Sequence, residues 1–149
     1  RLLDEFGPID LPPRFWEKTT MSTATPNEVS IELLSAFGDA WNQHDVERIM
    51  TFMADECVFE TTAGPEVGGK RYDGREAVKK AFARVFQIFP DAHFGNDVHF
   101  VSGNRGLSEW IFTGTPSDGK RLEVKGCDVF TFKNGKISHK DSFFKNRRT

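Results

Sequence analysis

The chain has 149 residues, of which 38% are hydrophobic, and its 20 basic and 22 acidic residues leave a net charge of -2. This length suits one domain with a full core and is too short for two ordinary domains. The balanced charge lacks the broad basic surface that nucleic acid or an anionic membrane attracts. No apolar run approaches the roughly 18 residues of a spanning helix, and no signal-peptide pattern precedes the domain. We therefore expect a soluble, cytoplasmic protein without nucleic-acid or membrane partners.

The first twenty residues differ in character from the rest of the chain. They contain Pro8, Pro12 and Pro13 and show no sustained period, and Met21 behind them resembles an ordinary start. A non-native or flexible leader over 1–20, followed by a single domain over 21–149, is the expectation. A true arm remains the alternative, because the exposed aromatics Phe15 and Trp16 would usually dock on something.

Helical periodicity dominates the first half of the domain. Thr25 and Glu28 form a capping box, and Asp45 and Asp73 are suitable caps for two later helices. Apolar residues then recur with a spacing close to 3.6. The helices are expected over residues 26–42, 46–53 and 74–89.

Strand patterns dominate the second half. Turn signals around Gly103, Gly119 and Gly135 separate segments rich in β-branched and aromatic residues. One further strand is expected before the third helix. Three N-terminal helices followed by a four-strand meander indicate an α+β fold. The strands are expected over residues 57–62, 93–101, 107–115, 122–132 and 137–143.

Asp128 occupies a position where a carboxylate is unexpected. Every second residue around it is apolar or glycine, including Val124 and Phe130, so Asp128 lies on a buried strand face. Burying an ionised carboxylate costs roughly several kcal/mol unless it is paired or protonated. Asp128 is therefore either a satisfied structural acid or a functional group in a cavity.

A second acid is expected beside it. In the last strand, Ile137, His139 and Asp141 share one phase, and we assign the other phase, which contains Lys140, to the outside. The hairpin at Gly135 makes the two strands neighbours, so Asp128 and Asp141 are expected to face one cavity. His139 is either a general base or an ion-paired side chain.

The strand at 107–115 carries apolar residues on both phases. Glu109 lies in phase with Ile111, while Trp110 and Phe112 take the opposite phase. Both sheet faces are thus expected to be covered, one by the helices and the other by a second subunit. A homodimer centred on Trp110 and Phe112 follows as a prediction.

The sequence shows no motif for a cofactor or metal. His44, His93 and His99 lack metal spacing, and neither a phosphate-binding glycine loop nor a nucleophile elbow is present. Cys57 and Cys127 are interpreted as free thiols, although a disulfide remains open. The expectation is no metal and no cofactor.

Four segments carry a family resemblance: Ala40 to Phe52, Met53 to Glu60, Tyr72 to Val78 and Gly126 to Ile137. Together they resemble the ketosteroid isomerase and SnoaL-like branch of the nuclear transport factor 2 superfamily. The resemblance covers about 28–144 and implies a curved, cone-shaped sheet wrapping helices around a deep apolar pocket, commonly in a dimer. It also implies that Asp128 matches the oxyanion-hole acid of ketosteroid isomerases, a carboxylic acid that an apolar site keeps protonated.

The same resemblance shows departures from the family. Phe37 and Thr61 stand where the isomerases have their catalytic Tyr and proton-abstracting Asp. Asp141 resembles the last-strand acid of SnoaL-like cyclases and of limonene epoxide hydrolase, whose Arg-x-Asp pair falls at Glu109 and Ile111 here.

The resulting hypothesis is a cofactor-independent acid-base enzyme, an isomerase, cyclase or hydrolase acting on a small hydrophobic, carbonyl-bearing or polycyclic molecule. One of Asp128 and Asp141 would take a proton while the other, protonated, stabilises an enolate oxygen. The alternative is a non-catalytic binding or interaction domain. Residues expected to contact the substrate are Phe37, Trp41, Thr61, Glu109, Phe130 and His139.

Overall fold

A computed structural model describes residues 29–148 of the chain. The expected leader over 1–20 and the expected cap at Thr25 lie outside these residues. No helix in the described range has the length and apolar character that a membrane crossing requires. The helices are α1 (Ile31–Asn42), α2 (Val46–Thr51) and α3 (Arg75–Ile88), and the strands are β1 (Met53–Glu60), β2 (Arg71–Asp73), β3 (His93–Ser102), β4 (Arg105–Gly114), β5 (Leu122–Lys133) and β6 (Lys136–Phe144).

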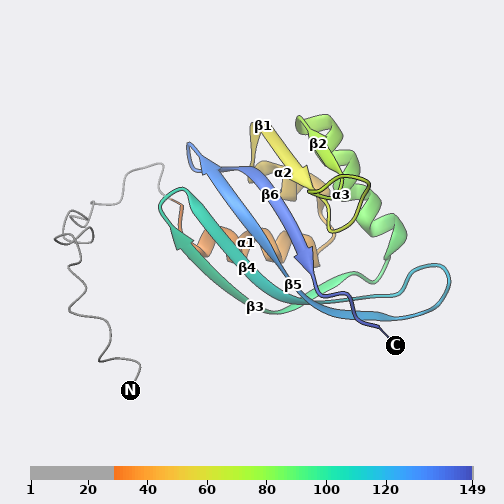
Figure 1. The fold of residues 1–149 in the computed structure, drawn as a ribbon. Helices are drawn as coiled ribbons and strands as arrows, with labels where there is room; N and C mark the ends of the chain where they lie inside the picture. The colour runs from red at the N-terminus through yellow and green to blue at the C-terminus, as the bar shows by residue number, and fades with distance from the viewer. Residues whose placement is uncertain (1–28, 149) are drawn as a thin grey trace, which may run out of the picture.

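The strands form one curved sheet whose order is β2-β1-β6-β5-β4-β3. Figure 1 shows all three labelled helices behind this sheet, so that one face is covered, here called the inner face, and the other is the outer face. The predicted α+β class and the predicted meander, β3 to β6, are confirmed. β1 adds to the meander by pairing in parallel with β6, and the short β2, which was expected to be loop, pairs antiparallel with β1.

Helix starts follow the capping residues only in part. Asp45 caps α2 as expected, since its side chain accepts a hydrogen bond from the Arg48 backbone N–H. Ser30 caps α1, which begins at Ile31. The prediction that Asp73 caps the third helix is wrong, because Gly74 is the cap residue and the Asp73 carboxylate instead accepts from the Arg71 side chain.

The core lies between the inner face and the helices and is built largely from aromatic rings. Phe37, Phe82 and Phe130 are at most 3% exposed, and Trp41 makes edge-to-face contacts with Phe37 and Phe82. Such offset and edge-on arrangements suit the ring quadrupoles. Phenylalanines of the described residues thus supply much of a wide interior with few hydroxyls to satisfy.

A β-bulge near the start of β6 decides which of its side chains face inward. Thr131 of β5 pairs with His139 and Phe132 pairs with Ile137, so Ser138 is an extra residue. Beyond the bulge the alternation is reversed, and Lys140 is buried on the inner face. The prediction that Asp141 and His139 share the inner face with Ile137 is therefore wrong.

The faces of β4 also differ from the expected ones. Trp110 and Phe112 are each 6% exposed and pack with Phe94 in the interior. Glu109 and Ile111, of the opposite phase, lie on the outer face. The prediction that Trp110 and Phe112 form a subunit interface is wrong, because the strand pattern allowed either phase to face the helices.

Candidate active site

A cavity of about 380 Å³ lies between α3 and the inner face of the sheet. Its size falls within the usual range for pockets that hold small molecules. Its walls are mainly aromatic and aliphatic, and Lys140 and Ser142 of β6 contribute polar groups. The phenylalanines of its lining are Phe59, Phe89, Phe94, Phe112 and Phe144.

Lys140 and Ser142 belong to a buried network centred on Asp128. The Asp128 carboxylate accepts hydrogen bonds from Lys140 Nζ at 2.9 Å, Ser142 Oγ at 2.5 Å and Trp110 Nε1 at 3.0 Å. Lys140 Nζ also donates to Ser142 Oγ at 2.8 Å. Asp128 and Lys140 are 6% and 5% exposed, so the ion pair is almost fully removed from water. Burial of both charges is tolerable because each has charged and hydrogen-bonded partners.

Aromatic faces surround the Lys140 ammonium. Its nitrogen lies 4.8 Å from the ring centre of Phe59, 5.2 Å from that of Trp41 and 5.8 Å from that of Phe82. Cation–π attraction at such distances stabilises a desolvated ammonium. The network therefore holds a positive charge beside an apolar cavity.

Hydrogen-bond donors dominate the polar lining of this cavity. Lys70, Arg84 and Lys140 line it, and none of its described lining residues is an acid. Trp41, also in the lining, has a buried indole N–H that makes no hydrogen bond to another described residue. A buried donor without a partner is uncommon in folded proteins. The cavity suits an apolar molecule with a carbonyl, enolate or other electron-rich oxygen.

A second series of hydrogen-bonded side chains lies near the Asp128 network. His99 contacts Ser108 Oγ through Nδ1 at 2.7 Å and Asp97 Oδ2 through Nε2 at 2.8 Å. These residues, together with Asp128 and Lys140, border a smaller cavity of about 30 Å³. That space is large enough for one water molecule. Both groups of polar side chains thus border the same small cavity.

The structure divides the residues expected in the site between the two faces. Asp128 lies on the inner face as predicted, and Trp41 and Thr61 line the larger cavity. Phe37 and Phe130 border the smaller cavity. The outer-face residues border neither cavity: Glu109, His139 and Asp141.

The pairing of Asp128 with Asp141 in one cavity is consequently wrong. Burial raises the pKa of the Asp141 carboxyl above its usual range, and the negative charge of Glu60 adds to this rise. Both effects belong to the outer face, where Asp141 contributes nothing to the lining of the cavity. The partner of Asp128 is Lys140, which the sequence pattern assigned to solvent.

Lys140 and Ser142 are the functional candidates that the pattern missed. Their phase of β6 is polar from Lys136 to Ser142 and apolar only at its last residue, Phe144, and such a polar run is typical of a solvated face. The available signal was the inward Asp128 itself, because a buried carboxylate requires a nearby donor and the adjacent strand carries a lysine.

Comparison with known proteins supports this description of the fold. The SnoaL-like domain family matches residues 34–140, and the chain belongs to this family. No curated protein matches the chain in sequence.

Solved structures with the same fold include three informative neighbours. A candidate polyketide cyclase from Xanthomonas campestris pv. campestris is 19% identical, with a TM-score of 0.68 over 76% of this chain and 88% of that one. A nuclear transport factor 2-like protein of unknown function from Mesorhizobium loti is 25% identical, with a TM-score of 0.66 over 83% and 97%. TerC, co-crystallised with polyporic acid, is 19% identical, with a TM-score of 0.65 over 81% and 92%. The fold is that of the nuclear transport factor 2-like superfamily, and at such identities the likeness concerns the fold.

Proposed function

We propose that the protein is a cofactor-independent enzyme of the isomerase or cyclase type that acts on a small apolar molecule with an enolisable carbonyl group. The observation that carries this proposal is the Lys140 ammonium, held by Asp128 beside a cavity of about 380 Å³ whose described lining contains no acid. The polyketide cyclase name and the polyporic acid complex of two neighbours agree with it.

Lys140 is assigned the stabilisation of developing negative charge. When a proton leaves the carbon next to a carbonyl, the electron pair moves to the oxygen, and an ammonium in a water-poor site stabilises that oxygen strongly. Asp128 keeps Lys140 charged and oriented. Asp128 is also the proposed proton acceptor, reached through the Ser142 hydroxyl that donates to it at 2.5 Å and lines the cavity.

Deuterium exchange tests this proposal without knowledge of the natural substrate. 2-Tetralone is bicyclic, apolar and enolisable, and proton NMR in D₂O follows the loss of its α-protons. The protein should accelerate this exchange over buffer, and Lys140→Met should return the rate to the buffer value. Lys79→Met is the matched control, because Lys79 forms an exposed ion pair with Glu47 and contacts neither cavity. Binding of 2-tetralone without faster exchange would contradict the proposal.

A binding domain without catalysis is the second candidate. It is favoured by the complete hydrogen bonding of Asp128 and by Phe37 and Thr61, which provide no acid or phenol. In this case 2-tetralone would bind with no change in its exchange rate, and Lys140→Met would lower only the affinity. The exchange measurement therefore separates the two candidates.

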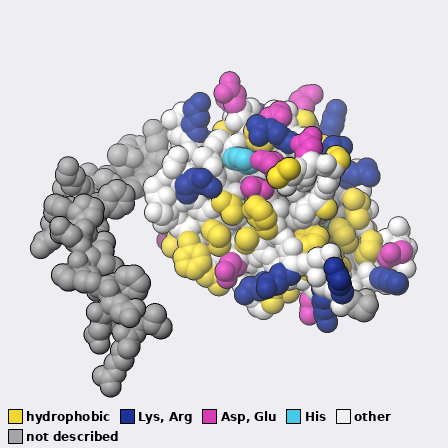
Figure 2. Space-filling model, viewed as in Figure 1, with side chains coloured by type: hydrophobic (Ala, Val, Ile, Leu, Met, Phe, Trp, Pro, Cys, Tyr) yellow, Lys and Arg dark blue, Asp and Glu magenta, His cyan; other side chains and the backbone are white. Residues whose placement is uncertain are grey.

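We also propose that two copies associate through the outer face. Figure 2, which views this face, shows hydrophobic side chains gathered on it. Val98, Phe100 and Phe143 are 47%, 57% and 50% exposed, and the first two pair with outer-face residues of β4. An interface of standard size buries about 800 Å² per partner. Sedimentation should show a dimer that Phe100→Lys converts to a monomer, and a monomeric wild-type protein at micromolar concentration would contradict this.

A cytoplasmic location completes the proposal. Cys57 and Cys127 are both free thiols, which is the form that a reducing compartment maintains. Immunofluorescence or fractionation of the producing cell tests this location, and recovery of the protein from an oxidising compartment would overturn it.

A further inference from the structure

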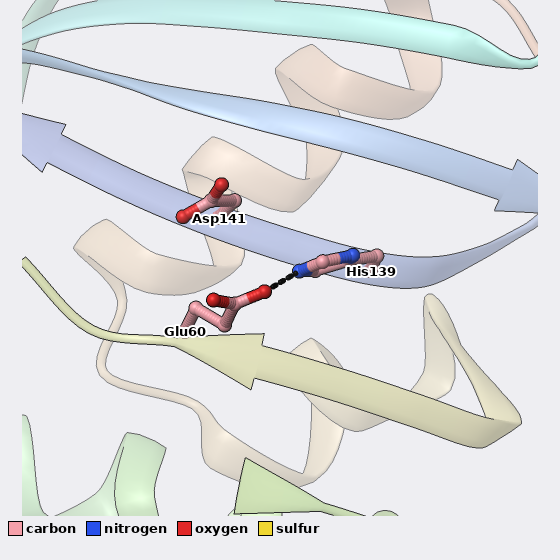
Figure 3. Close-up of side chains that lie close together, drawn as sticks. All are labelled: Glu60, His139 and Asp141. Carbon is pink, nitrogen blue, oxygen red and sulfur yellow. Dashed lines mark ion pairs between the residues drawn. The ribbon is translucent and has the colours of Figure 1, made fainter. Parts of the chain in front are cut away.

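Three potential metal ligands converge on the outer face, away from the cavity. Glu60 of β1 and His139 and Asp141 of β6 each offer one ligand atom, and these atoms all lie within 4.8 Å of one another. Figure 3 shows the three side chains gathered between the two strands, with the imidazole of His139 directed at Glu60. They are neither fully buried nor fully exposed, with side-chain exposures of 32% for His139 and 18% for Glu60.

The backbone fixes this arrangement. Parallel pairing places Glu60 opposite Asp141, and His139 and Asp141 are separated by one residue and therefore share a face. The bulge at Ser138 turns both of them outward. Gly68 packs closely against the Glu60 carboxylate, because a Cβ at this position would lie 2.2 Å from Glu60 Oε2. The cluster thus depends on two regular strands and a closely packed loop.

The charges in the cluster are poorly matched without a cation. Glu60 and Asp141 bring two carboxylates together, and the Glu60 charge contributes to the raised pKa of Asp141. The neighbouring cation, Arg71, is 3.9 Å from Glu60 and is shared with Asp73 at 3.1 Å. His139 Nε2 is shielded from solvent and makes no hydrogen bond of good geometry, although Glu60 Oε1 is 2.7 Å away. A nitrogen lone pair and two carboxylates around one point form a donor set that attracts a metal ion.

We propose that Glu60, His139 and Asp141 bind a divalent transition-metal ion, with Zn²⁺ as the best-suited probe. One imidazole nitrogen and two carboxylate oxygens are accepted ligands of Zn²⁺ at about 2.0 to 2.2 Å. Such bonds separate the ligand atoms of a tetrahedral site by about 3.3 Å, so the side chains need only small movements to reach it. Three protein ligands leave a fourth position for water. The bound ion links β1 to β6 and removes the repulsion between the two acids.

Isothermal titration of the full chain with Zn²⁺ tests the site, after dialysis against a chelator. We expect one ion per chain, and the visible spectrum of the Co²⁺ form should show the absorption of a low-symmetry, four- or five-coordinate site. His139→Gln and Asp141→Asn should each weaken binding by at least about tenfold, since each removes a ligand. His93→Gln is the matched control, because it removes an exposed histidine on β3, far from the cluster in the sheet order.

Thermal unfolding separates a loss of Zn²⁺ binding from a loss of folding, because the melting temperature of each variant is measured both in chelator and with Zn²⁺. In chelator, the melting temperatures of His139→Gln and wild type should be close, and added Zn²⁺ should raise only that of wild type and His93→Gln. Zn²⁺ binding that survives His139→Gln, equal weakening by His93→Gln, or no binding up to millimolar Zn²⁺ would overturn the proposal. Because no readout involves a substrate, failure of the proposed enzyme activity would leave this result unaffected.

Discussion

The inner and outer faces of the sheet each bring charged side chains of β6 together with an acid of a neighbouring strand, but the two faces compensate these charges differently. On the inner face, Asp128 and Lys140 are almost fully buried and every contact is a matched donor and acceptor. On the outer face, Glu60 and Asp141 are only partly buried and repel each other beside His139. Water can compensate a mismatch on the outer face, whereas the inner face has to be satisfied by the chain itself.

This difference shows which charges the fold depends on. Removing a partner from the inner network leaves a charge without water, while removing one from the outer cluster leaves a charge that solvent reaches. Strand β6 thus contributes to stability through the buried Lys140. It also contributes side chains to both proposed binding sites, one on each of its faces.

The largest effect is expected from Lys140→Met, which keeps the length of the side chain but leaves the Asp128 carboxylate buried without its counter-charge. Breaking a buried pair in this way costs about 3 to 5 kcal/mol. The free energy of unfolding in urea measures it. The matched change in an exposed pair, Lys79→Met, should cost less than about 1 kcal/mol.

A double variant tests whether the energy belongs to the pair. Asp128→Asn combined with Lys140→Met removes both charges and keeps one amide oxygen, which can accept a hydrogen bond from Trp110 or from Ser142. The double variant should lose less stability than the sum of the two single losses, because the two residues are in contact. Additive losses, or a loss below about 1 kcal/mol for Lys140→Met, would show that the pair is not a unit of the fold.

A smaller loss, about 1 to 3 kcal/mol, is expected for Gly126→Ala on β5. A Cβ there would lie 2.5 Å from the Trp110 ring and 2.4 Å from the Phe143 carbonyl oxygen, so Trp110 would be displaced from Asp128. Gly38→Ala, in helix α1, is the opposite case. Its Cβ would have only Asp97 Oδ2 nearby, at an ordinary contact distance of 3.7 Å. It should gain about 0.5 to 1 kcal/mol. Urea unfolding of both variants checks the signs, and a destabilising Gly38→Ala would contradict the described packing.

The sequence predicted the parts of this fold in which one pattern is dominant. Asp45 caps α2, the apolar stripe of α3 includes the buried Val78 and Phe82, and the meander strands begin and end close to the predicted residues. Asp128 was correctly placed inside because its neighbours in phase are apolar. These predictions use local spacing alone, which the tertiary structure preserves.

Other features depend on contacts that local spacing does not contain. Both phases of β4 are apolar, so alternation could not place Trp110 inside. Both phases of β6 are polar from Ser138 to Ser142, and the bulge at Ser138 reverses them. Glu60 reaches His139 only through the parallel pairing of β1 with β6, which joins distant parts of the sequence. The sequence therefore predicted Asp128 as a buried acid, but its partners Lys140 and Ser142 follow only from the pairing of the strands.

On the outer face, Glu60→Gln in metal-free protein should change the free energy of unfolding by less than about 1 kcal/mol. The partly exposed contact with His139 is weakened, but the repulsion with Asp141 is lost as well. Urea unfolding in chelator measures this change. A loss comparable with that of Lys140→Met would show that the two faces do not differ as described.

The smallest effect concerns the two thiols, one on each face. Burial raises the pKa of Cys57 and of Cys127 above the usual range, and for Cys127 the charges of Asp128, Glu109 and Asp141 add to the rise. Less thiolate is then present at neutral pH, so alkylation by iodoacetamide should be slow and should accelerate as pH rises. Mass spectrometry should detect modification of Cys127 before that of Cys57, which is 1% exposed. Earlier modification of Cys57 would show that Cys57 is the more accessible thiol, which would contradict its burial in the core.

A crystal structure of the protein with 2-naphthol tests the central claim most directly, because this molecule resembles the enol of 2-tetralone. We expect the naphthol ring to lie between α3 and the inner face, within the cavity of about 380 Å³, with its oxygen about 3 Å from Lys140 Nζ. The Asp128 contact with Lys140 should persist in the complex. A naphthol bound on the outer face, or one bound in the cavity with its oxygen directed away from Lys140, would contradict the account.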